Sequence, residues 1–102
     1  MHKVMIFLKR RPDLSFPDFK HWAENQHTAI AAKLPGIRGY RMNVPPVEAP
    51  GAPYDAVSEI WFDSAEARAA VMASDQGKAA GDDAATHCAS RTPFPVDEKI
   101  AV

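Results

Sequence analysis

Two side chains suited to proton transfer, His27 and Tyr40, stand thirteen residues apart in the stretch ENQHTAIAAKLPGIRGY. A histidine gains and loses protons near neutral pH, so it suits general acid–base catalysis. A tyrosine hydroxyl can hold or polarise a carbonyl or phenol oxygen. We take the pair as the candidate catalytic residues. The structural alternatives are a histidine that only fixes the end of its helix and a tyrosine that only packs in a sheet.

Three further candidates lie in the segment YDAVSEIWF, and we assign them to substrate binding: Asp55, Glu59 and Trp61. A carboxylate is costly to bury alone, so Glu59 needs a partner, for which His27 or an arginine would serve. Asp55 stands where the strand begins, at the mouth of a site. The structural alternatives are an ion pair for Glu59 and a core or interface position for Trp61.

The sequence lacks the motifs that indicate a binding site for a cofactor or a metal. It has no CxxC pair, HExxH, glycine-rich phosphate loop or GxSxG, and its four histidines lack ligand spacing. We therefore expect no cofactor and no metal. The single cysteine, Cys88, excludes an internal disulfide and fits a reducing cytoplasm. His87 is adjacent to Cys88, but neighbours on a helix point in different directions, so a catalytic thiol has no local support.

Charge and hydropathy exclude two classes of partner. The formal net charge is −1 and there is no basic block, so nucleic acid and anionic membranes are not expected partners. The opening MHKVMIFLKRR has too short an apolar run for a signal peptide or a membrane span. The length of 102 residues predicts a single domain over residues 1–102, with one modest core.

The pattern predicts four strands and three helices that position these residues. We expect strands at residues 3–10, 37–44, 54–62 and 92–102, and helices at about 16–34, 64–74 and 75–90. The first strand is apolar on both faces, which is typical of a central strand. Pro93 and Pro95 mark the last strand as an edge or bulged one. Pro35 and Gly36 end the first helix.

The first helix carries an apolar stripe with His27 at its border. At 100° per residue the stripe holds six residues, while His21 falls on the solvated side. Those six are Phe19, Trp22, Ala23, Gln26, Ile30 and Leu34. The next strand places Tyr40 and Met42 on one face.

The order of elements predicts an α+β fold, the ferredoxin-like βαββαβ arrangement with helices on one face of an antiparallel sheet. The third strand carries apolar residues on both faces, among them Val57 and Trp61 on one side and Ile60 and Phe62 on the other. The face without helices therefore needs a cover. The simplest cover is a second copy packed face to face, a homodimer with twofold symmetry.

The chain also resembles a known family over nearly its whole length. The segments FLKRRPDLSFPDFKHWAENQHTAIAAKLPGIRGY, PYDAVSEIWFDSAEARAAVMASDQGKA and TPFPVDEK are similar, in the same order, to segments of EthD-domain proteins. The resemblance implies a dimeric α+β barrel in which a ligand lies between the sheet and the first helix of each subunit. It implies much less about activity, because the wider superfamily has many functions.

Three functions fit these observations. The first is a small cofactor-independent enzyme of catabolism, an isomerase or lyase that transfers protons on an apolar carbonyl compound such as a lactone or enone. Here His27 acts as general acid and base and Tyr40 orients the substrate. The second is a non-catalytic binding or accessory protein of an ether or aromatic oxidation system. The third is a haem protein with His27 as axial ligand, for which a single histidine gives little support.

Overall fold

The computed structural model describes all of residues 1–102 and has the ferredoxin-like α+β fold that the sequence predicts. The elements are, in order, β1 (His2–Arg10), α1 (Phe16–His21), the π-helical segment η1 (Trp22–His27), α2 (Thr28–Ala31), β2 (Ile37–Asn43), β3 (Ala56–Phe62), α3 (Ala65–Ala73), α4 (Asp75–His87) and β4 (Cys88–Val96). The four strands form one antiparallel sheet in the order β2-β3-β1-β4. As expected, β1 is central and β4 is an edge strand.

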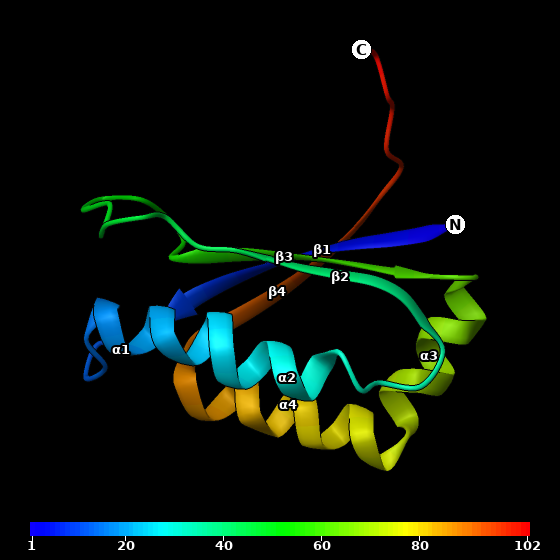
Figure 1. Cartoon of the computed structure of the whole chain (residues 1–102), viewed down its shortest axis with the longest axis horizontal. Helices are drawn as coiled ribbons and strands as arrows, with labels where there is room; N and C mark the ends of the chain where they lie inside the picture. Colours follow the sequence, from blue (N-terminus) through cyan, green and yellow to red (C-terminus); the bar gives the residue numbers. More distant parts are fainter.

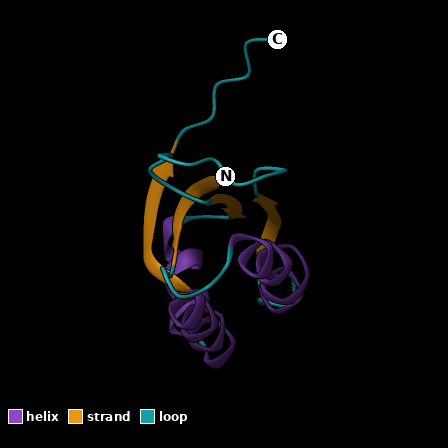
Figure 2. Cartoon of the chain, turned by 90° about the vertical axis from the view of Figure 1, so that its left-hand side faces the viewer, coloured by secondary structure: helices purple, strands orange, loops and turns teal.

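The helices cover one face of the sheet and leave the other open (Figures 1 and 2). Strand residues alternate between the two faces. The covered face holds the buried core residues Val4, Ile6, Leu8, Ala56, Ile60 and Phe62. The open face holds Met5, Phe7, Val57 and Trp61, which are half-buried, and Phe94, which is 56% exposed. Residues 97–102 follow β4 as a coil that leads away from the domain (Figure 1).

The first helix differs from the prediction because its middle turn is π-helical. His27 and Ala31 are buried, whereas Gln26 and Ile30, both expected on the apolar stripe, are exposed. A π turn hydrogen-bonds from i to i+5 and so fits more residues into a turn than an α-helix does. The buried face therefore continues at a spacing of four residues, from Ala23 through His27 to Ala31. Regular helix geometry would place His27 only at the border of this face.

Several boundaries differ as well, and β4 ends at Val96 although the sequence predicts a strand that reaches residue 102. The first helix ends at Ala31, earlier than expected, and Gly36 makes the turn into β2 with a φ of +80°. Helix α4 ends at His87, and Cys88 begins β4. This strand pairs antiparallel with β1, and Cys88 stands opposite Arg10. The two prolines of β4 are tolerated because an edge strand needs partners on one side only.

Serine caps begin the helices at the expected places, with one exception. The hydroxyls of Ser15 and Ser64 accept from backbone N–H groups three residues on. The third helix is capped by Ser74, which accepts from Gly77 N at 3.1 Å, and not by Asp75 as the sequence suggested. No helix is both long enough and apolar enough to cross a membrane.

Candidate functional site

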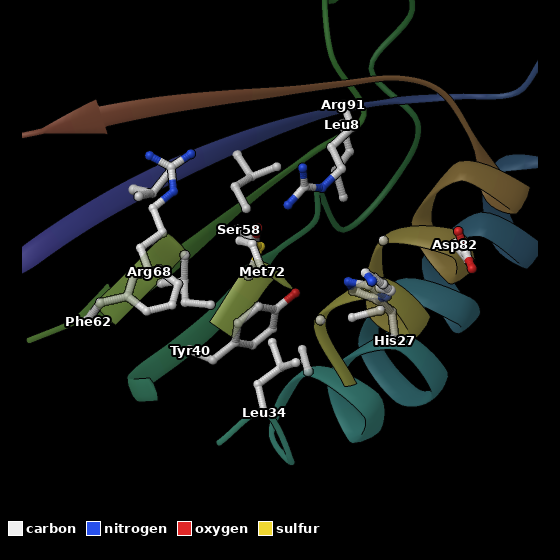
Figure 3. A pocket seen from close by; sticks show the side chains of 18 residues that line it. Leu8, His27, Leu34, Tyr40, Ser58, Phe62, Arg68, Met72, Asp82 and Arg91 are labelled. Atoms are coloured by element: carbon white, nitrogen blue, oxygen red, sulfur yellow. The ribbon is translucent and has the colours of Figure 1, made fainter. Parts of the chain in front are cut away.

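A cavity of about 410 Å³ lies between the covered face of the sheet and the helices (Figure 3). Its walls are mostly apolar and come from β1, β3, α2, α3 and α4. Seven polar side chains interrupt them: His27, Tyr40, Ser58, Arg68, Lys78, Asp82 and Arg91. An apolar cleft with a few converging polar groups is the usual form of a small-molecule site.

His27 is held in this wall by a carboxylate behind it. Its Nδ1 lies 2.9 Å from Asp83 Oδ2, and the side chain is about 10% exposed. The same oxygen accepts a hydrogen bond from Trp22 Nε1 at 3.0 Å. The Trp22 ring packs between His27 and His87, with centroid distances of 5.0 and 4.4 Å. These contacts fix the imidazole with Nδ1–H donating to Asp83, and Nε2 makes no hydrogen bond to the protein.

Burial keeps this imidazole neutral. The pKa of His27 is lowered from its usual 6.5, mainly because the charged form loses its hydration, although Asp83 acts in the opposite direction. A neutral imidazole that donates from Nδ1 carries its lone pair on Nε2. His27 is therefore arranged as a base at the wall of the cavity.

Tyr40 projects from β2 into the same cavity, as Figure 3 shows, with its ring centroid 6.4 Å from that of His27. Burial raises the pKa of Tyr40 to about 12, against the opposing influences of Ser58 and Arg91. The phenol therefore stays protonated at physiological pH and can donate a hydrogen bond to an oxygen of a bound molecule. The structure thus brings the two candidate catalytic residues to one cavity.

The three candidate substrate-binding residues do not line this cavity. On β3 the covered face belongs to Ser58, Ile60 and Phe62, so Glu59 and Trp61 point to the open face. Glu59 accepts from Lys3 Nζ at 2.9 Å, so its partner is neither His27 nor an arginine.

Trp61 lies against Gly39, where an added Cβ would come within 3.0 Å of its ring. Asp55 accepts from the backbone N of Arg10 at 2.8 Å and borders a separate, more open cavity next to Phe7 and Tyr54. Any contact of these three candidates with a ligand would thus lie outside the cavity of His27 and Tyr40.

Asp83 and Arg91 are the site residues that sequence reasoning missed. Asp83 lies 56 residues from His27 and next to Ala84, at the border of a buried stripe of small residues on α4. An acidic residue beside such a stripe is a weak sequence signal for a partly buried carboxylate with a specific partner. Arg91 stands opposite Leu8 in the β1–β4 register, on the covered face, but the strand was expected to begin only at residue 92.

Two other kinds of chemistry find no support in the geometry. No three His, Cys, Asp or Glu side chains lie close enough together to hold a metal ion. Cys88 is buried, which raises the pKa of its thiol to about 12, so it does not form the reactive thiolate near neutral pH.

Comparison with known proteins places the chain in a family but not in a function. The model of the EthD domain matches residues 11–89. A solved structure of an EthD family protein from Bacillus halodurans C-125 is 25% identical, with a TM-score of 0.79, and the match covers 97% of this chain and all of that one. No curated protein matches the chain significantly.

More distant structures share the fold. A protein of unknown function from Thermobifida fusca YX, described as dimeric and ferredoxin-like, is 17% identical with a TM-score of 0.74, over 93% of this chain and 88% of that one. HapK from Hahella chejuensis is 16% identical with a TM-score of 0.70, over 100% of this chain and 95% of that one. At these identities the likeness concerns the fold alone.

Proposed function

The chain belongs to the EthD domain family, and from this premise we propose that it is a small cofactor-independent enzyme that transfers protons on an apolar carbonyl compound, as an isomerase or lyase. One observation carries the proposal: a buried, neutral His27 is oriented by Asp83 toward an apolar cavity that also receives the protonated hydroxyl of Tyr40. Pairs of groups set up to take and to donate a proton are typical of acid–base catalysis.

The chemistry follows from the two groups. His27 Nε2 takes a proton from the carbon next to the substrate carbonyl. The electron pair of the broken C–H bond forms a C=C bond, and the π pair of the carbonyl moves onto its oxygen. Tyr40 donates a hydrogen bond to that oxygen while its negative charge develops. Return of the proton from His27 to a different carbon gives an isomer. Loss of a leaving group from the neighbouring carbon, with the proton going to that group, gives elimination, the reaction of a lyase.

The test is proton transfer on compounds of this class. We expect the purified protein to isomerise α-angelica lactone or a β,γ-unsaturated cyclohexenone, or to exchange their α-protons for solvent deuterium, as followed by NMR. Tyr40→Phe should lower the rate by about 10²–10³, the usual cost of removing one donor to a developing oxyanion. Tyr54→Phe is the matched control, because Tyr54 packs on Phe7 outside the cavity.

Two outcomes would count against the proposal. Equal rates for Tyr40→Phe and Tyr54→Phe would remove Tyr40 from the mechanism. Binding of these compounds with neither isomerisation nor exchange would favour the alternative of a non-catalytic binding or accessory protein. The cytoplasm as its compartment stays a prediction that rests on the use of a single cysteine.

We further propose that two copies pack through their open sheet faces to form a homodimer. The support is the apolar patch formed by Met5, Phe7, Val57, Trp61 and Phe94, which no helix covers, together with the dimeric state given for the structure from Thermobifida fusca YX. Covering such a patch with its own copy gives a closed twofold assembly.

A charge placed in this patch should separate the copies. Light scattering on the native protein should give twice the chain mass of 11.2 kDa. Phe94→Glu should give a monomer, since burying an unpaired carboxylate costs several kcal/mol, roughly the scale of a weak interface. Val47→Glu is the control, because Val47 is 72% exposed in the loop between β2 and β3. A native monomer would refute the dimer.

A further inference from the structure

The polar groups of the cavity carry an excess of positive charge that the proposed proton transfer does not use. Three cationic side chains line the cavity, Arg68, Lys78 and Arg91, against one carboxylate, Asp82. The chain as a whole carries a formal charge of −1, so this local excess opposes the general balance. A neutral lactone or enone would have no use for it.

The two arginines among them have no anionic partner in the protein. Of the four arginines outside the cavity, Arg10, Arg11 and Arg38 each pair with a carboxylate within 4 Å, and Arg41 lies over the Trp61 ring. The side chains of Arg68 and Arg91 make neither a salt bridge nor a hydrogen bond, although both belong to the same cavity wall. A guanidinium presents a fork of donors that matches a carboxylate, so an unpaired one at a cavity is set to receive an anion.

Arg91 is the better placed of the two to select a ligand. It projects from the covered face of β4, opposite Leu8, and Figure 3 shows its guanidinium directed into the space that Tyr40 also faces. As a residue on an edge strand it is exposed, which puts it at the mouth of the cavity. Loss of hydration and the charge of Arg68 lower the pKa of Arg91, and the negative charge of a bound anion offsets both effects.

We infer that the substrate carries a carboxylate next to its apolar body, and that Arg91, assisted by Arg68, binds this carboxylate at the mouth while the apolar part fills the cavity. The inference rests on the proposed function for the role of the cavity and adds the class of substrate: an apolar carbonyl compound that is also an acid. Arg91 is then a specificity-determining residue, while proton transfer stays with His27 and Tyr40.

The experiment compares two probes of the same shape that differ in charge. Isothermal titration with 2-naphthoate and with naphthalene-2-carboxamide should show that the carboxylate binds about 10- to 100-fold more tightly, the range expected for a charge-assisted pair. Arg91→Gln should remove most of this preference. Arg91 contacts no other side chain through a polar bond, so the substitution leaves the fold intact, which circular dichroism checks.

Controls separate this inference from the proposed function. Arg38→Gln removes a positive charge outside the cavity, where Arg38 pairs with Asp63, and should keep the preference. His27→Gln should also keep it, because binding of the carboxylate does not need the base. Equal affinities for the two probes, including no binding of either at millimolar concentration, would overturn the inference. A preserved preference without any proton transfer would instead overturn the proposed function alone.

Discussion

His27→Gln should lower kcat/KM for a compound that the enzyme isomerises by a factor of about 10²–10⁴, the usual contribution of a general base. Glutamine keeps a donor that can reach Asp83 and fills a similar volume, so the core around Trp22 stays closed. What it lacks is a lone pair of suitable basicity at the position of Nε2. The measurement is the steady-state rate beside the thermal unfolding curve of each variant.

Asp83→Asn should give a smaller loss, about 10- to 100-fold, because it leaves the base in place but weakens the control of its tautomer and orientation. Asp83 raises the pKa of His27, so removal of its charge lowers that pKa further. The base must be unprotonated to act, and kcat/KM therefore falls as the pH drops through the pKa of His27. In Asp83→Asn this fall should begin at lower pH than in the native protein.

His21→Gln is the matched control for both variants. His21 lies on the same helix but is exposed, with Asn25 as its neighbour, so its replacement should change neither the rate nor the pH profile. Equal rates for His27→Gln and His21→Gln would exclude His27 as the base. An acid limb that stays at the same pH in Asp83→Asn would show that another group controls it.

The sequence predicted most of the fold because the pattern of each element is local. The double-sided apolar run of β1, the Pro35–Gly36 stop and the alternation around Tyr40 each depend on neighbouring residues only. The main error in the first helix has a physical cause. Regular 100° spacing put Gln26 and Ile30 on the buried stripe, and the π turn replaced them with His27 and Ala31. Trp22 and His27 of this turn both hydrogen-bond Asp83 of α4, a long-range contact that a sequence periodicity does not contain.

The sequence predicted the part of the site that depends on residues close together along the chain. His27 and Tyr40 flank one turn, so a helix followed by its adjacent strand brings them to one side of the sheet. Asp83 and Arg91 reach the cavity from the second half of the chain, and their contacts depend on how α4 and β4 dock onto the first half. The assignment of Glu59 and Trp61 to the site supposes that the residues facing a ligand lie on the strand side away from the outer helices. The cavity lies on the other side of β3, and the alternating pattern alone does not tell the two sides apart.

Two glycines of α4 look equivalent in the sequence, where each should weaken the helix by about 1 kcal/mol relative to alanine. The structure shows that their surroundings differ. A Cβ at Gly77 would lie 2.1 Å from the carbonyl oxygen of Val71 and 2.9 Å from Met72 Cα, and these are backbone atoms that no side-chain rotation can move. A Cβ at Gly81 would meet nothing within 4 Å. Gly77 therefore permits the close approach of α3 and α4, and Gly81 has no such role.

The two alanine variants should therefore change stability in opposite directions. Gly77→Ala should lower the free energy of unfolding by about 1–3 kcal/mol or more, because the strain of forcing the two helices apart exceeds the gain in helix propensity. Gly81→Ala should raise it by up to about 1 kcal/mol, since the new methyl group costs no contact. Urea unfolding of the two variants and the native protein measures both values. Changes of the same sign would mean that the α3–α4 contact is not as close as the structure shows.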